Sequence, residues 1–271
     1  MLTAVQKAIA SIHQRYDTPL TLGELAAEVY VSPFHFSRMF ARVTGVTPGR
    51  YLTAVRLFEA KRLLLTTSLT VSDIVCSVGY SSVGTFTSRF TRGVGMTPTQ
   101  YRGPEVAELL VAASPDFHRI PAFDAMRAAG VNCAAPQYDG GALVGQIEMP
   151  DDREWHTLVG VFADPIPQRG PVAFSALEAA TSGELIVNNI PQGRWVVIAA
   201  AQAVDDDSPD GFAIGIVRTP VVVTHDETAG VNIRLRALRP TDPPIAITLA
   251  TTGSALGTSN VVPLRAVREA A

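Results

Sequence analysis

Cysteine is scarce in this sequence. Cys76, in an apolar helical stretch, and Cys133, in a stretch with the composition of a linker, are the two cysteines among 271 residues. A scaffold held together by disulfides needs a far higher proportion. The chain also lacks an opening segment with the cationic and apolar parts of a secretory signal. Both absences lead us to expect a protein of the reducing cytoplasm.

Long hydrophobic runs are lacking too. Hydrophobic residues make up 47% of the chain, but Pro, Gly or a charged residue interrupts each apolar stretch before it reaches the roughly 20 residues of a membrane span. We therefore expect no membrane partner. The composition is ample for buried cores, and 271 residues exceed the usual single domain of roughly 100–150 residues, so we expect two domains.

Groupings that carry out catalysis are absent as well. His118, His156 and His225 are scattered, and no Ser or Cys lies in a recognisable nucleophile motif. The run Asp205–Asp207 is most simply a solvated loop, with a Ca²⁺ site as the alternative. We therefore expect no enzyme activity, no catalytic residue, no metal and no cofactor.

The charge of the chain is divided unevenly. The net charge of -3 combines residues 1–103, where 11 Lys and Arg face 5 Asp and Glu, with residues 104–271, where 11 face 20. The first part is therefore basic, at +6, and the second acidic, at -9. A polyanion is the expected partner of the basic part.

The basic part contains an internal repeat. The segment Phe36–Tyr51 returns as Phe86–Tyr101 at an offset of 50 residues, and Leu22–Ala26 matches Val71–Val75 at an offset of 49. One residue has therefore been added in the second copy, between the matched blocks, where a turn is expected. The chain builds the same unit twice.

Each copy predicts two short helices joined by a turn. In copy one, apolar residues of 22–29 recur at helical spacing, and Ser32 followed by Pro33 is typical of the start of a second helix. Gly45 suits the left-handed position that ends this helix. Between the copies, residues 48–66 predict an amphipathic connector helix.

The length of the connector favours double-stranded DNA as the polyanion. A helix of about 18 residues spans roughly 27 Å, and its flanking turns bring this close to the roughly 34 Å of one DNA turn. Two recognition helices can then enter successive major grooves. The target need not be palindromic, because one chain supplies both helices.

The second helix of copy one, residues 33–44, has an apolar face and an opposite face suited to a major groove. On that face Arg38 can bond guanine with both arms of its guanidinium, Phe34 can contact a thymine methyl, and Arg42 can meet phosphate. His35 lies beside them. A solvated basic face is the alternative, but the repeat and the cap pattern favour DNA binding.

Copy two carries fewer groups that can read bases. Its outward positions are Gly84, Ser88 and Thr91 with Arg92, and Arg89 is displaced toward the flank. We expect this helix mainly to hold phosphates and the first helix to carry most of the discrimination.

These residues resemble the AraC/XylS family over residues 10–102. The resemblance is carried by Asp73–Ser82, by Phe86, Arg89 and Phe90, and by Gly95–Arg102. It implies a seven-helix module with two helix-turn-helix motifs. It also implies that the base and phosphate contacts fall on Phe34, Ser37, Arg38, Val83, Gly84, Thr87 and Ser88.

Two features depart from the pattern of this family. The family often has Arg where this sequence has Ser88, and it usually places the module at the C-terminus rather than at residues 1–103. The second departure leaves the remaining domain without an identity from the resemblance.

The acidic part predicts a linker and an all-β sandwich. Residues 104–139 contain four prolines and no sustained pattern, which is typical of a linker. From residue 140 to 271, short runs rich in β-branched residues alternate with Gly, Pro and Asp turns. The expected strands are Leu143–Met149, Thr157–Phe162, Glu184–Ile190, Arg194–Ala201, Pro220–Thr224, Val231–Leu238 and Ile245–Leu249.

Part of this region resembles another family. The stretch Leu185–Val197, with the later Val221–Val223 and Val231–Leu235, is similar to transthyretin-like sandwiches of the carboxypeptidase-regulatory kind. The similarity covers about 140–250 and implies binding or assembly rather than catalysis.

The sequence thus predicts a DNA-binding transcription regulator followed by a β domain of open role. The β domain senses a small ligand, with Trp155, Trp195 and Phe212 as candidate lining residues, or it is a structural module that pairs protomers or binds another protein. Core packing is the other interpretation of these aromatic residues. Beyond double-stranded DNA, the partners considered are a small-molecule effector, RNA polymerase and a second copy of the chain.

Overall fold

The chain divides into two compact units. A computed structural model describes residues 2–131, 140–225 and 227–250, so Cys133 lies outside the described residues. The helical unit consists of the described residues of 1–107 and 239–246, and the β-rich unit of those of 108–238 and 247–271. The helices are α1 (Leu2–Arg15), α2 (Leu22–Glu28), α3 (Pro33–Thr44), α4 (Pro48–Thr66), α5 (Val71–Ser77), α6 (Val83–Val94), α7 (Pro98–Tyr101), α8 (Pro104–Glu108) and α9 (Phe123–Ala128).

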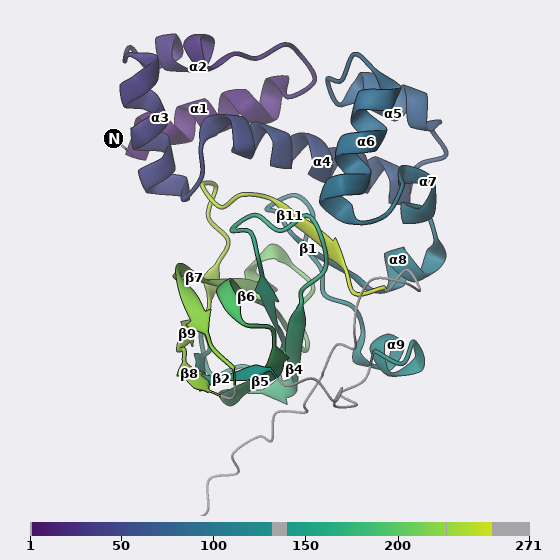
Figure 1. The fold of residues 1–271 in the computed structure, drawn as a ribbon, viewed down its shortest axis with the longest axis vertical. Helices are drawn as coiled ribbons and strands as arrows, with labels where there is room; N and C mark the ends of the chain where they lie inside the picture. The colour runs from purple at the N-terminus through teal and green to yellow at the C-terminus, as the bar shows by residue number, and fades with distance from the viewer. Residues whose placement is uncertain (1, 132–139, 226, 251–271) are drawn as a thin grey trace, which may run out of the picture. The chain divides into compact units, whose positions relative to one another are not determined.

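The two copies of the repeat fold alike in the helical unit (Figure 1). Ser32 and Ser82 cap α3 and α6, each hydroxyl accepting from the backbone N–H three residues later. Gly45 and Gly95 end these helices at φ values of 85° and 88°, a left-handed conformation that glycine adopts without steric cost. The same serine cap and the same terminal glycine therefore set the start and the end of α3 and of α6.

The extra residue of copy two lies in the turn. Residues 29–32 join α2 to α3, whereas residues 78–82 join α5 to α6. The insertion therefore changes the turn and leaves the helices intact.

Each copy packs around a chain of three neighbouring aromatic rings. In copy one, Phe36 and Phe40 lie 5.6 Å apart between ring centroids, and Phe40 and Tyr51 5.4 Å. The equivalent two pairs in copy two, fifty residues later, are both 5.5 Å apart. Such pairs add stability beyond their buried area, so each helix-turn-helix has a core of its own.

The connector α4 has the bounds that the sequence predicts, but it is not amphipathic in the structure. Its buried residues extend around most of the helix, from Tyr51 and Val55 to Ala60 and Leu64. The reason is that α1, α3, α5 and α7 all contact it, and Figure 1 shows it between the two copies.

The β-rich unit contains two larger sheets over a shared core. Five strands lie in the order β10-β7-β6-β3-β4, and β5-β2-β8 form the second sheet, in which β9 also pairs with β2. Buried residues of both sheets, such as Leu143, Val187, Val159 and Val197, form one cluster. The strands are β1 (Leu110–Ala113), β2 (Gly141–Glu148), β3 (Trp155–Phe162), β4 (Ala173–Ala180), β5 (Gly183–Ile190), β6 (Gly193–Ala203), β7 (Phe212–Val223), β8 (Thr228–Gly230), β9 (Ile233–Arg234), β10 (Arg236–Ala237) and β11 (Ile245–Thr248).

Several elements differ from the sequence expectation. The expected linker 104–139 contains α8, β1 and α9, and the expected strand at 231–238 is split into β9 and β10, which pair with different sheets. Strand β4 was not predicted. The β2 strand pairs in parallel with β8 and β9, so its sheet is mixed. Residues 239–246, expected in the β domain, belong to the helical unit.

Candidate nucleic-acid interface

Helix α3 presents the copy-one candidates to solvent. Phe34 is 73% exposed, an unusual state for a large apolar side chain. The Arg38 guanidinium lies 5.7 Å from the centre of the Phe34 ring. His35 and Arg42 are also exposed, and Ser37 is half-buried. The structure therefore places an aromatic ring and a guanidinium side by side on the outward face.

The N-termini of α3 and α6 suit an anionic partner. Neither helix has an acidic residue in its first turn, whereas α2 and α5 carry Glu24 and Asp73 there, in capping boxes. The free N–H groups and the dipole of a helix N-terminus favour negative charge. The N-termini of α3 and α6 are thus suited to meet phosphates.

Helix α6 exposes smaller side chains than α3 does. Val83 is 42% exposed, Gly84 and Ser88 are exposed, and Thr87 is half-buried. A Cβ added at Gly84 would meet only Ser82 Oγ, at 3.9 Å. Space for a side chain therefore exists at Gly84, and no neighbouring atom requires glycine there.

The arginines of α6 lie at its edge. The Arg89 guanidinium lies over the Tyr80 ring, 5.9 Å from its centre, and Arg56 of α4 lies over the same ring at 5.7 Å. Burial is the main cause that lowers the pKa of Arg56 from its usual value. Arg92 is exposed in the last turn of α6. Copy two thus offers cations around an outward face of small side chains.

Tyr30, in the turn before α3, was not predicted from the sequence. Tyr30 is 92% exposed and has a positive φ of 57°. Its counterpart at the offset of 49 residues is Gly79, also in the left-handed region at 77°. That alignment was the available signal, because an exposed tyrosine in a position that glycine fills in the other copy is unusual.

The aromatic residues proposed to line a ligand site in the β-rich unit are mostly core. Trp155 and Phe212 are each 1% exposed, and the Trp155 indole N–H donates to the Asp151 carboxylate over 3.1 Å. Trp195 is half-buried, and its indole N–H donates to the Pro191 carbonyl over 2.7 Å. Their packing and hydrogen bonds account for these side chains without a ligand.

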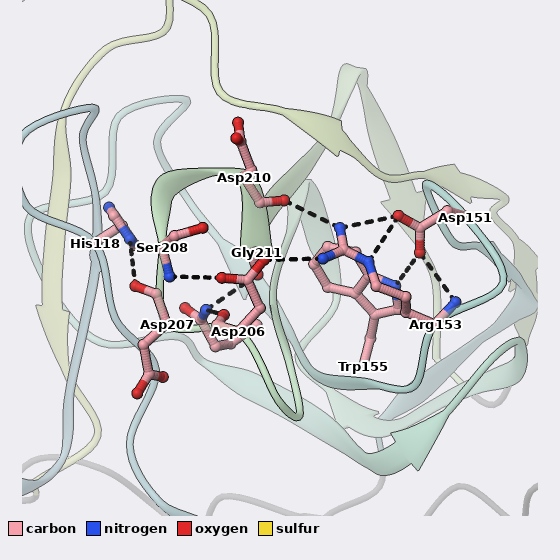
Figure 2. Close-up of polar contacts among 10 residues, drawn as sticks. His118, Asp151, Arg153, Trp155, Asp206, Asp207, Ser208, Asp210 and Gly211 are labelled. Carbon is pink, nitrogen blue, oxygen red and sulfur yellow. Dashed lines mark hydrogen bonds and ion pairs between the residues drawn. The ribbon is translucent and has the colours of Figure 1, made fainter.

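The loop that contains Asp205–Asp207 is held by Arg153 (Figure 2). Arg153 lies over Trp155, 4.9 Å from the ring centre, and forms ion pairs with Asp151 and Asp206 over 2.9 and 3.0 Å. It also donates to the Asp210 carbonyl over 3.1 Å. The Asp206 carboxylate therefore takes part in the structure of the loop.

Neither a metal-ligating cluster nor a membrane-spanning helix is found in the described part of the chain. Within residues 2–131, 140–225 and 227–250, no three or more His, Cys, Asp and Glu side chains gather as a metal ion would require. Over the same residues, none of the helices combines the length and the apolar character needed to cross a bilayer.

Comparison with known proteins identifies the helical part. A family of helix-turn-helix domains matches residues 25–103. The lactose operon transcription activator of Staphylococcus xylosus is 32% identical over 98 residues, which are 36% of this chain and 35% of that protein. The melibiose operon regulatory protein of Escherichia coli is 34% identical over 98 residues, 36% of this chain and 32% of that protein.

One solved structure is also similar in sequence. A transcriptional regulator of Chromobacterium violaceum, described as having an AraC-type DNA-binding domain, is 28% identical with a TM-score of 0.36, covering 37% of this chain and 90% of that one. The chain spans about a third of the length of the curated relatives it matches. Residues 25–103 therefore form a helix-turn-helix domain of the AraC/XylS family.

Proposed function

We propose that the chain is a sequence-specific DNA-binding transcription regulator that reads two successive major grooves. The observation that carries this proposal is the duplicated helix-turn-helix, in which α3 and α6 are capped alike and expose the same face of the repeat. The net charge of +6 on residues 1–103 supplies the attraction to phosphates.

The connector supports two grooves rather than one. Helix α4 has 19 residues, so at about 1.5 Å per residue it is about 28 Å long. With its flanking turns this length approaches the roughly 34 Å between successive major-groove entries on one side of the duplex. The burial of α4 on most sides makes it a firm spacer.

The two helices contribute unequally to this function. We infer that Arg38 and Phe34 discriminate bases. Arg42 binds phosphate, and His35 lies beside these residues in the same interface. In copy two, Arg89 and Arg92 bind phosphates around the small outward side chains of α6. The named contacts of the family resemblance, including Ser37, Val83, Gly84, Thr87 and Ser88, form the rest of the interface.

Selection of duplexes from a random pool by the full chain tests this function. We expect enrichment of a non-palindromic site with two informative blocks about one helical turn apart, and gel shifts that weaken steeply with salt. A folded chain that enriches no duplex would contradict the proposal.

We further propose that the β-rich unit, a sandwich formed by its two larger sheets, senses a small ligand and controls DNA binding. The chain leaves the helical unit after residue 107 and returns to it at residues 239–246, which we call the return segment. The chain leaves it again after residue 246, so a change in the β-rich unit has three covalent connections through which to act on the DNA-binding part.

The return segment bonds directly to the connector. The Tyr51 hydroxyl donates to the Asp242 carbonyl over 3.2 Å, and the Lys61 ammonium donates to the Ala246 carbonyl over 2.6 Å. Both donors belong to α4, and Tyr51 and Lys61 are buried. Because α4 sets the spacing of α3 and α6, a shift of the return segment would alter how both helices meet DNA.

A matched pair of variants tests this coupling. Tyr51→Phe removes only the hydroxyl that bonds the return segment, and we expect it to weaken the effect of an effector on DNA affinity. Tyr101→Phe is the control, because among the described residues the buried Tyr101 hydroxyl of copy two has no hydrogen-bond partner. Equal behaviour of the two variants would contradict the coupling.

Dimerisation through a strand edge is the second candidate role of the β-rich unit. Among the described strands, β4 lies at one end of the five-stranded sheet and pairs with β3 on one side only. A melting temperature that rises with the logarithm of a metabolite's concentration supports sensing, whereas a ligand-free dimer by light scattering supports assembly. A monomer that no metabolite stabilises would contradict both roles.

A further inference from the structure

Tyr30 is held in a backbone conformation that a tyrosine seldom adopts. Its φ of 57° lies in the left-handed region, where a Cβ crowds the following carbonyl oxygen. Only glycine enters this region without a steric cost. The strain therefore needs a compensating contribution from the side chain, in stability or in function.

Packing supplies little of that compensation. The Tyr30 side chain is 92% exposed, so it buries almost no apolar surface. Its described contact is with Lys7 of α1, whose ammonium lies 5.9 Å from the centre of the ring. An exposed cation–π contact of this kind is weak, about 0.5–1 kcal/mol.

Copy two shows what the turn itself requires. Gly79 occupies the equivalent position, and a Cβ there would lie 2.7 Å from the Tyr16 carbonyl oxygen. Both residues make the same turn bond, Tyr30 N–H to the Ala27 carbonyl and Gly79 N–H to the Cys76 carbonyl, over 3.1 and 3.3 Å. The turn thus works with glycine, and the tyrosine of copy one adds a ring that the fold does not need.

The surroundings of Tyr30 fit an anion. It lies two residues before the cap Ser32, at the end of α3 where the helix dipole favours negative charge. Lys7 donates one of its three N–H groups to the Glu28 carbonyl over 2.8 Å, which fixes its ammonium beside the ring. A phenol and an ammonium next to the N-terminus of a recognition helix are the groups that bind DNA phosphates.

We propose that Tyr30 and Lys7 form a phosphate clamp that binds the DNA backbone beside the groove entered by α3. This rests on the proposed DNA-binding function and adds two contacts outside the family's base-reading positions. The hydroxyl of Tyr30 donates to a phosphate oxygen, and the Lys7 ammonium neutralises the same strand. Copy two has Gly79 at the position of Tyr30, so the clamp fixes the orientation of the first half-site only.

The test compares stability and DNA affinity in the same variant of the full chain. Tyr30→Gly installs the residue of copy two, so we expect a melting temperature equal to or above that of the unmodified chain, together with a Kd about tenfold higher for the selected duplex. Tyr30→Phe should lose most of the same affinity. Lys7→Gln should reduce the slope of log affinity against log salt concentration by about the contribution of one phosphate contact.

The control for nonspecific effects is Val222→Ala, which changes an exposed apolar residue of β7. We expect it to leave the DNA affinity unchanged.

Two outcomes overturn the clamp alone, and a third overturns the proposed function together with the clamp. If the unmodified chain binds the duplex and Arg38→Ala weakens it, but Tyr30→Gly binds normally, the clamp alone is wrong. If Tyr30→Gly keeps its DNA affinity but loses activation of transcription in vitro, the ring contacts a protein instead. If the unmodified chain selects no duplex, both proposals fail.

Discussion

At the scale of single residues, Lys61 is the most unusual group of the helical unit. Its side chain is 1% exposed within α4, and its ammonium lies 5.9 Å from the centre of the Tyr101 ring. Burial lowers the pKa of Lys61 from 10.5 to about 7. The Ala246 carbonyl accepts a hydrogen bond from this ammonium, so the return segment takes part in its burial.

This buried lysine predicts a rise of stability with pH. The unfolded chain keeps the proton up to the usual pKa of 10.5, whereas the folded chain releases it near 7, so between these values the unfolded state binds more protons. The free energy of unfolding should therefore rise by up to about 1.4 kcal/mol per pH unit from about pH 7.5 to pH 9. Urea titrations of the full chain and of Lys61→Met at several pH values measure this change in the free energy of unfolding. The same slope in both proteins would contradict this assignment.

At the scale of elements, the two glycines that end α3 and α6 predict a matched pair of effects. Gly45→Ala and Gly95→Ala should each destabilise the helical unit by about 1 kcal/mol, because alanine is strained at φ values of 85° and 88°. At Gly45 an added Cβ would meet only open space, which leaves backbone strain as the cause. Gly49→Ala, inside α4 with equal open space and no positive φ, is the control and should be neutral or stabilising. Thermal unfolding of the three variants measures these effects, and a loss of stability in Gly49→Ala equal to that in Gly45→Ala would contradict the prediction.

Elements with local signals could be predicted from the sequence. Ser32, Gly45 and their copies bound α3 and α6 through caps that depend only on neighbouring residues, and the repeat doubled the evidence. Strand β4 was missed because its sequence, AFSALEAA, favours helix by propensity, and pairing with β3 overrides that preference.

Features that depend on distant contacts could not be predicted. The bond from Tyr51 to Asp242 joins residues 191 positions apart, and nothing in the Pro-rich sequence around Asp242 indicates a helical partner. The amphipathic prediction for α4 failed for the same reason, since its additional buried faces are covered by tertiary contacts. The exposure of Phe34, Arg38 and Ser88 was predictable because it follows from the helical period.

At the scale of the whole molecule, the return segment changes what an isolated DNA-binding fragment should do. Residues 1–103 contain every candidate contact, so the fragment should still bind the selected duplex. It lacks the Ala246 carbonyl and the rest of the return segment, so its melting temperature should be lower than that of the helical unit in the full chain. The rise of stability with pH should also be absent, because Lys61 is no longer covered.

Calorimetry and gel shifts on the fragment and the full chain measure these differences. A fragment as stable as the full chain, with the same pH dependence, would show that the return segment contributes nothing to the helical unit.

We propose that one chain reads DNA with two unequal helices. The most direct measurement is the binding free energy of every single-base variant of the selected duplex, for the unmodified chain, Arg38→Ala and Arg92→Ala. We expect Arg38→Ala to remove about 1–3 kcal/mol of preference at one base pair, and Arg92→Ala to weaken all duplexes alike. Equal loss of base preference from both substitutions would show that the two helices do not differ in this way.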